Sequence, residues 1–166
     1  MGESGCYVPH VIWDKHQQLF KMWYSGGEQY EPDAIGYATS KDGLHWTKLK
    51  NNPIFKADPS KSWEQYKVTA CQVIERENDY LMFYIGFYDI NFAQIGMARS
   101  KDGISGWERY SGNPIISPTE NSWDASATYK PFAIQEKDRW MLWYNGRNEH
   151  LEQIGLAIHN GHDLSF

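Results

Sequence analysis

The segment 19–24, with the sequence LFKMWY, decides the fold because two counterparts follow it. YLMFYI contains Tyr84 and RWMLWY ends at Tyr144, so the aligned tyrosines are 84 − 24 = 60 and 144 − 84 = 60 residues apart. Other motifs recur with similar spacing: Ile-Gly-x-Ala from Ile35, Ile95 and Ile154, Ser-Lys-Asp-Gly from Ser40 and Ser100, Asn-Pro from Asn52 and Asn113, and Trp followed by an acid at Trp63 and Trp123. Self-similarity at this period indicates one repeated supersecondary unit.

Each unit contains short β-rich segments separated by turn-forming residues. First strands are expected at 7–13, 68–74 and 128–134, second strands at 19–24, 80–85 and 139–144, third strands at 35–39, 95–99 and 154–158, and fourth strands from Trp46 and Trp107. No segment has a sustained apolar period of 3.6 residues, so no helix is expected. Four antiparallel strands in each evenly spaced unit predict an all-β fold built from β-propeller blades.

The length of the chain limits how much of a propeller it can form. Its 166 residues make a little under three units, which we assign to one domain with blades at approximately 1–57, 58–118 and 119–166. Closed propellers have four to eight blades, so one copy is expected to form a partial propeller. Apolar blade faces at both ends predict a homo-oligomer, with a dimer that closes a six-bladed ring favoured, or a fragment of a longer protein.

Bulk composition excludes several classes of partner. The net charge is −5, the pI is about 5.6 and no run of Lys or Arg is present, so neither nucleic acid nor a membrane is an expected partner. No signal peptide is seen, which predicts a cytoplasmic protein unless the N-terminus is truncated. No metal-ligand spacing or cofactor motif is present, and Cys6 and Cys71 are expected to be buried core thiols.

Three stretches resemble a known superfamily. They are Met22-Trp23-Tyr24-Ser25-Gly26, the segment 35–46 (IGYATSKDGLHW) and Asn52-Pro53-Ile54, with a second copy at 95–115. The pattern is similar to the five-bladed β-propeller glycosidases, which include glycoside hydrolase families 43, 32 and 130, and about three of the five blades are covered, resembling the C-terminal part. The resemblance implies a carbohydrate ligand and cleavage of a glycosidic bond by paired carboxylates at the propeller channel. None of the three family 32 sequence motifs is intact in this chain.

Topology separates turn-forming acids from candidate catalytic acids. If the first strand of each blade runs down from the active face, the turns after the second and fourth strands lie on that face. Asp14, Asp42, Asp79 and Asp102 then lie on the opposite side, as turn formers. The catalytic candidates on the active face are Glu31, Asp33, Glu64, Asp89, Asp124 and Glu149. Glu64 and Asp124 occupy equivalent repeat positions, which a shared structural role would also explain.

The same face collects aromatic, amide and basic side chains suited to sugars. The substrate-binding candidates are Tyr30, Trp63, Tyr66, Tyr88, Trp123, Tyr129, Lys130, Asn145, Arg147, His150 and His10. His10 lies on an expected inner strand, where a buried, hydrogen-bonded histidine is the alternative interpretation.

Two functions remain open from the sequence. The first is a glycosidase or glycoside phosphorylase, which requires two carboxylates facing one cavity. The second is a non-catalytic carbohydrate-binding or structural propeller fragment whose catalytic blades are missing, which requires only exposed rings and hydrogen-bonding groups. A protein-interaction propeller is a third choice.

Overall fold

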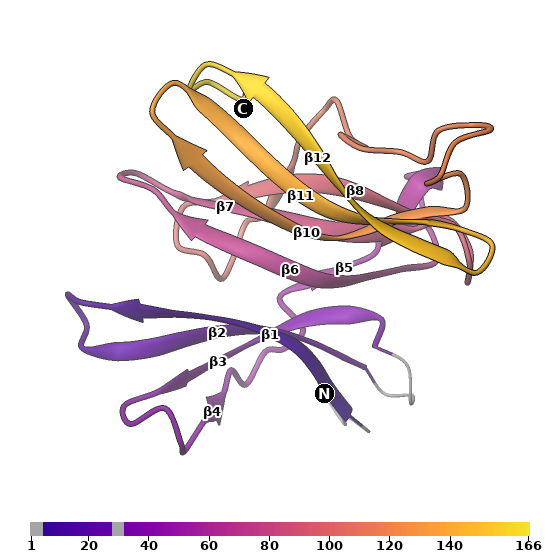
Figure 1. Cartoon of the computed structure of the whole chain (residues 1–166). Coiled ribbons are helices and arrows are strands. Elements are labelled where there is room, and N and C mark those ends of the chain that lie inside the picture. Colours follow the sequence, from indigo (N-terminus) through magenta and orange to yellow (C-terminus); the bar gives the residue numbers. More distant parts are fainter. Residues whose placement is uncertain (1–4, 28–31) are drawn as a thin grey trace.

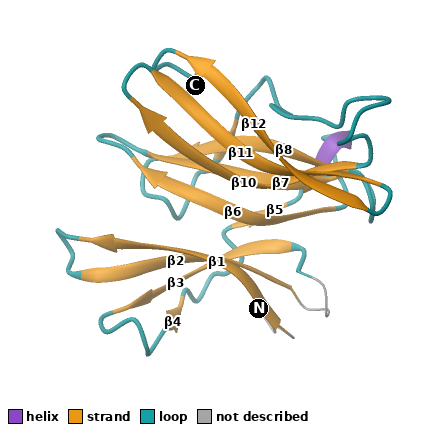
Figure 2. Cartoon of the chain, viewed as in Figure 1, coloured by secondary structure: helices purple, strands orange, loops and turns teal. Residues whose placement is uncertain are grey.

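A computed structural model describes residues 5–27 and 32–166 as three antiparallel β-sheets, which we call blades one, two and three. Figure 1 shows them stacked in chain order, with blade two between the other two blades. Strands dominate the described chain, as Figure 2 shows, and the purple helix, which we call η1, is a single 3₁₀ turn, Ser62–Glu64. The predicted all-β propeller architecture is therefore confirmed.

Blade one contains β1 (Gly5–Asp14), β2 (Leu19–Gly27), β3 (Ala34–Ser40) and β4 (Thr47–Lys48) in that order, and the short β5 (Phe55–Lys56) also pairs with β3. The predicted four strands are present, and β5 is an addition that the repeat did not indicate.

Blades two and three repeat this order. Blade two contains β6 (Lys67–Glu75), β7 (Tyr80–Phe87), β8 (Ala93–Ser100) and β9 (Glu108–Arg109). Blade three contains β10 (Ala127–Glu136), β11 (Arg139–Asn148) and β12 (Leu151–Asn160), and is one strand short, as predicted.

Aromatic and branched side chains fill the two wedges between blades. In the first wedge Trp23 and Tyr37 of blade one pack with Tyr80, Met82 and Tyr84 of blade two. In the second wedge, Leu81, Phe83 and Met97 of blade two pack with Trp140 and Leu142 of blade three. Large aromatic side chains therefore contribute to the core in both wedges.

The turns on one side of the blades use aspartates as predicted. Asp42 Oδ1 accepts hydrogen bonds from the amides of Leu44 and His45, both at 2.8 Å. Asp102 and Asp14 accept amide hydrogen bonds in their own turns in the same way. An Asp side chain that accepts amides two and three residues ahead stabilises a tight turn.

Each inner strand carries an irregularity at the same repeat position. Val8, Ala70 and Lys130 have φ values of 45°, 40° and 52°, and the strand register shifts beside each of them. Non-glycine residues rarely adopt this left-handed region, so the three residues form equivalent β-bulges.

The two cysteines differ in environment. Cys71 is buried as expected, and burial raises the pKa of its thiol to about 12. Cys6 is exposed, so the expectation of a buried thiol at that position was wrong. The reason is that Cys6 lies near the start of β1 in an end blade, whereas Cys71 lies on β6 between two blades.

Candidate functional site

Two pockets are lined by neighbouring residues of the segment 62–66, which contains η1 and leads into β6. The first, which we call the Trp63 pocket, has a volume of about 460 Å³. The second, which we call the Asp33 pocket, has a volume of about 360 Å³. Ser62 and Trp63 line the first pocket and Gln65 and Tyr66 line the second.

The Trp63 pocket combines aromatic and polar side chains. It is lined by Ser62, Trp63, Tyr88, Asp89, Phe92, Gln94 and Pro114. The rings of Tyr88 and Phe92 meet edge to face with centroids 6.4 Å apart, and Tyr88 is exposed. Predicted candidates Trp63, Tyr88 and Asp89 therefore meet in one cavity. The sequence did not predict Phe92 and Gln94 as site residues, although Phe92 lies in the same loop as Tyr88.

The Asp33 pocket is lined by residues of blade one and of the segment that leads into blade two. Its lining includes Asp33, which directly precedes β3, and Tyr66, which directly precedes β6. Both side chains are exposed, and Lys67 Nζ lies 5.5 Å from the centre of the Tyr66 ring. An acid, an exposed aromatic ring and Gln65 thus face one hollow, a combination that can hydrogen-bond and stack against a polar ring.

Glu64 is a buried structural acid beneath these pockets. Its carboxylate accepts a hydrogen bond from Tyr84 Oη at 2.8 Å and pairs with Arg109 of β9. Burial raises the pKa of Glu64, against the opposing effects of Tyr84 and Arg109. Because the side chain is fully buried, it is not positioned to contact a substrate.

Asp124 occupies the same position in blade three. Its carboxylate accepts a hydrogen bond from Tyr144 Oη at 3.2 Å, and the preceding Trp123 stacks on the Tyr144 ring with centroids 5.8 Å apart. Trp63 lies against Tyr84 at the equivalent position, with the rings tilted and their centroids 5.6 Å apart. A Cβ on the facing glycines, Gly86 and Gly96 in blade two and Gly146 and Gly155 in blade three, would collide with these indoles. The repeated Trp-acid pair is therefore a brace for the blade.

Three further acid candidates stand in the loops. Asp89 Oδ1 accepts the amides of Asn91 and Phe92, both at 2.8 Å, and these hydrogen bonds lower the pKa of Asp89. Asp33 and Glu149 are exposed, and their carboxylates make no hydrogen bond or ion pair with another residue in the described part of the chain. Glu31 and Tyr30 lie outside the described residues.

The candidates of blade three lie around the inner strand and the β11–β12 turn. Burial, together with Glu152, raises the pKa of Tyr129 to about 12. Lys130 is exposed at the bulge, with its Nζ 5.4 Å from the Tyr129 ring. Asn145 pairs with Tyr129 in the strand register.

The remaining candidates of this blade are in or beside the turn. Arg147 Nη2 donates to the carbonyl of Asn91 in blade two at 2.9 Å. His150 is exposed in the β11–β12 turn. Glu152 was not predicted, although it lies two residues after His150.

His10 links two blades. Its Nε2 lies 2.8 Å from the carbonyl oxygen of Val73, and burial lowers its pKa below the usual value of 6.5. The side chain therefore matches the alternative interpretation of a partly buried, hydrogen-bonded histidine.

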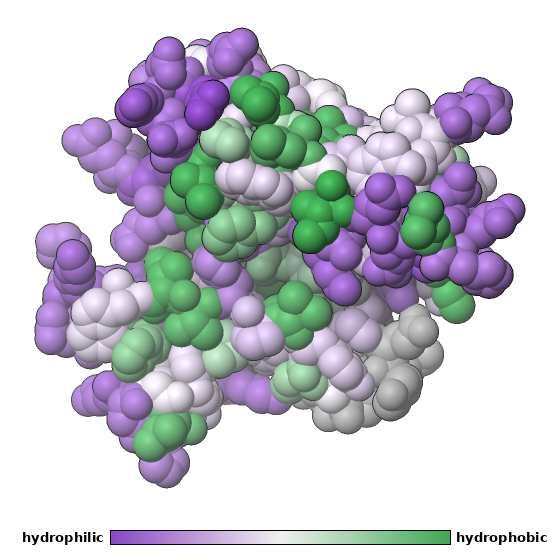
Figure 3. Space-filling view, viewed as in Figure 1, coloured by the Kyte–Doolittle hydropathy of each residue, from purple (hydrophilic) through white to green (hydrophobic). Residues whose placement is uncertain are grey.

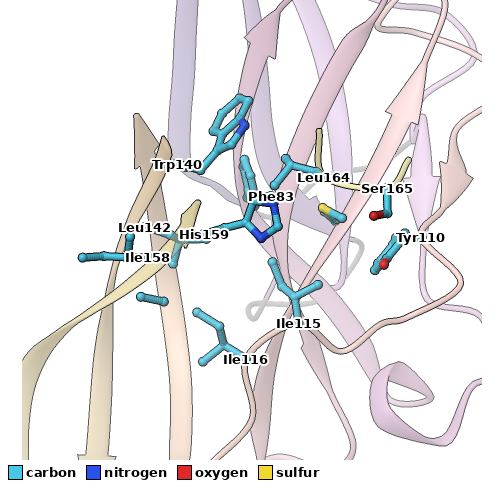
Figure 4. Close-up of a pocket in the computed structure, with 13 residues that line it drawn as sticks. Phe83, Tyr110, Ile115, Ile116, Trp140, Leu142, Ile158, His159, Leu164 and Ser165 are labelled. Carbon is cyan, nitrogen blue, oxygen red and sulfur yellow. The ribbon is translucent and has the colours of Figure 1, made fainter. Parts of the chain in front are cut away.

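An apolar cavity of about 290 Å³ lies between blades two and three. Figure 4 shows its lining, in which Phe83, Trp140 and Leu142 gather with Ile115 and Ile116 around the hollow. None of the predicted site residues that the structure describes lines it, and its described lining contains no carboxylate. The described residues contain no group of three His, Cys, Asp or Glu side chains able to hold a metal ion. They also contain no helix long and apolar enough to cross a membrane.

The sequence has few informative relatives. No family model matches the chain. It is 26% identical over 162 residues to Uncharacterized protein Rv1502 of Mycobacterium tuberculosis strain H37Rv, a match that covers 90% of this chain and 49% of that protein. The chain spans about half the length of the curated relatives it matches.

Solved structures define the class of fold. Zg3597, a family 117 glycoside hydrolase from Zobellia galactanivorans, has a TM-score of 0.77 and 18% identity, covering 96% of this chain and 55% of that chain. The family 32 β-fructofuranosidase BmSUC1 of Bombyx mori has a TM-score of 0.71 and 17% identity, covering 93% and 32%. The chain has the fold of part of the five-bladed propeller glycoside hydrolases.

One similar structure has a different activity. The N-acetylgalactosamine deacetylase from F. plautii, solved with blood group B trisaccharide, has a TM-score of 0.74 and 16% identity, covering 93% of this chain and 50% of that chain. Similarity of fold therefore does not fix a reaction for this chain, whose chemistry depends on its own residues.

Proposed function

We propose that the chain forms a carbohydrate-binding wall of a glycoside hydrolase-like propeller. The observation that carries this proposal is the pair of pockets, each with an exposed aromatic ring, an acid and a glutamine. Tyr88 and Tyr66 offer flat apolar faces for the C–H side of a pyranose. Gln65 is exposed and Gln94 is buried; their Nε2 groups donate to the Tyr88 carbonyl and to Ser117 Oγ, so their amide oxygens are the groups proposed to accept hydrogen bonds from sugar hydroxyls. The sugar-related fold supports the same ligand class.

Cleavage of a glycosidic bond needs two carboxyl groups on either side of the bond, about 5–5.5 Å apart for retention and about 6.5–9.5 Å apart for inversion. We propose to test two acids for this role, Asp33 of blade one, which lines the Asp33 pocket, and Glu149 of blade three, which lines neither pocket. Their carboxylates are exposed and unengaged within the described structure, whereas Glu64 and Asp124 are buried in braces and Asp89 holds a turn. Glu31 stays a candidate from the sequence.

A non-catalytic binding wall is the second candidate function, and it needs only the pockets. The test is a panel of glycans measured both for binding by calorimetry and for release of reducing sugar. Asp33→Asn and Glu149→Gln should abolish turnover while binding persists, and Asp138→Asn, in a turn on the opposite face, serves as the matched control. Binding without turnover in the unaltered chain would support the non-catalytic function. No binding to any glycan would overturn both.

A further inference from the structure

The two end blades each have an apolar sheet face that no described residue covers. In blade three, strand pairing places Phe132, Trp143 and Leu156 in one row and Ile134, Met141 and Ile158 in the next. Ile154 lies on the same side, two residues before Leu156. We call this set the blade-three outer face. Figure 3 shows hydrophobic side chains gathered over the region of β10–β12.

The equivalent residues of blades one and two are buried, unlike those of blade three. The strand register makes Ile35, Ile95 and Ile154 equivalent, and the first two are 0% exposed whereas Ile154 is 74% exposed. Tyr37 and Met97 are 4% and 3% exposed, whereas the equivalent Leu156 is 45% exposed. In blades one and two the next blade covers these positions. The side chains of blade three are therefore of the kind that a neighbouring blade buries.

Blade one presents the complementary surface. Its outer face contains Val11, Trp13, Phe20, Met22 and Trp46, with the rings of Trp13 and Phe20 4.6 Å apart. Val11, Met22 and Phe20 are equivalent to Val73, Met82 and Tyr80 of blade two, which pack on blade one. Val73 is 1% exposed and Val11 is 41% exposed. The blade-one outer face thus repeats the surface that docks inside this chain.

We infer that the blade-three outer face binds the blade-one outer face of a second copy of this chain. The contact would repeat the packing that the chain makes twice internally, which is why a second copy fits it better than an unrelated partner. With two-fold symmetry the contact forms twice and closes a ring. Such a ring holds six blades, inside the range of four to eight, with a smaller turn between blades than in a five-bladed ring. The inference depends on the fold and not on the proposed function.

Sedimentation equilibrium of the 166-residue chain tests the inference, and a dimer at micromolar concentration is expected. Ile154→Glu on one face and Val11→Glu on the other should each weaken dimerisation about 100-fold, as for loss of a central interface side chain. Both positions are exposed in a single copy, so the monomer should fold, which circular dichroism would verify. Leu44→Glu, at an exposed turn, is the matched control and should leave the dimer unchanged.

Mixing the two variants makes the test specific to the head-to-tail arrangement. An equimolar mixture of the Ile154→Glu and Val11→Glu proteins contains one unaltered blade-three face and one unaltered blade-one face, so a mixed dimer with one intact contact should form. Recovery of the dimer on mixing supports the inference. A monomeric unaltered chain, a dimer insensitive to either variant, or no recovery on mixing would each overturn it.

Discussion

Gln72 of β6 makes two hydrogen bonds to the backbone of Ala133 in β10. Its Nε2 donates to the Ala133 carbonyl at 2.9 Å, and its Oε1 accepts from the Ala133 amide at 2.5 Å. His10 stands at the same repeat position in blade one and bonds the Val73 carbonyl of the next inner strand. One polar side chain per wedge therefore fixes the inner strands of adjacent blades against each other.

The His10 link should make stability depend on pH. Because burial lowers the pKa of His10, the unfolded chain binds a proton more readily than the folded chain. Its contribution to the free energy of unfolding is complete above the unfolded pKa near 6.5 and is lost as the pH falls from there toward the lower folded value. His10→Gln, which copies Gln72, should flatten the urea-derived stability between pH 7 and pH 5. An equally steep dependence of stability on pH in this variant would contradict the assignment of the pH dependence to His10.

The two Trp-acid braces should differ in strength. Glu64→Gln leaves Arg109 without its charged partner and should lower the free energy of unfolding by about 3 kcal/mol. Asp124→Asn removes no ion pair between described residues and should cost about 1 kcal/mol, the value of one hydrogen bond. Thermal or urea unfolding measures both. Equal losses of unfolding free energy in the two variants would show that the ion pair with Arg109 does not add to stability.

A buried lysine stabilises the first wedge. Lys21 Nζ lies 2.6 Å from Asp14 Oδ2 and donates to Tyr80 Oη at 2.9 Å, whereas the equivalent position in blade two is the apolar Leu81. Lys21→Leu should cost about 2 kcal/mol because Asp14 is left without its cation. Combining it with Asp14→Asn should recover part of the loss. A double variant as unstable as the single one would argue against the ion pair as the cause.

The inner-strand bulges predict that a glycine substitution increases the stability of the protein. Val8 is β-branched and has a φ of 45°, a conformation that costs an L-residue about 1–2 kcal/mol. Val8→Gly should therefore raise the free energy of unfolding by about 1 kcal/mol, less than the full strain because glycine also loses more entropy on folding. Val11→Gly, in regular strand, should destabilise the protein instead. Chemical denaturation compares the two, and destabilisation by both would exclude relief of strain.

Tyr88 should contribute to glycan affinity. An exposed ring that stacks on a sugar contributes about 1–1.5 kcal/mol, so Tyr88→Ala should weaken binding about tenfold. Leu44→Ala, at an exposed turn on the opposite side of the blades, should leave affinity unchanged. Calorimetric titration with a glycan that the unaltered chain binds provides the measurement, and unchanged affinity in Tyr88→Ala would exclude the Trp63 pocket as the binding site.

Local motifs were enough to predict the blades. The Ile-Gly and Lys-Asp-Gly repeats mark strands and turns within a few residues of each other, and such contacts are visible in sequence. The pairing of Glu64 with Arg109 joins residues 45 positions apart, so only the folded wedge shows it. The repeat did indicate that Glu64 and Asp124 share a role, but which acids remain available for a ligand depends on this tertiary pairing.

The left-handed bulges were not predicted, for a physical reason. Val8, Ala70 and Lys130 have different side chains, and none is the glycine that usually marks a positive φ. The conformation is imposed by the surrounding sheets. For example, Ser25 Oγ of the neighbouring blade accepts a hydrogen bond from the Ala70 amide at 2.6 Å. Local sequence does not encode a strain that tertiary contacts impose.

Trp63 packs closely over Gly86 of β7 and Gly96 of β8, and the same side chain lines the Trp63 pocket. The two glycines let the indole lie close to the sheet formed by β7 and β8, while the loop from Tyr88 to Phe92 continues beyond these strands. The loop can therefore change without altering the packing of Trp63 on the sheet. Exchanging that loop for one with different polar groups should redirect ligand choice while the melting temperature of the blade stays the same, which makes this chain a frame for grafted specificities.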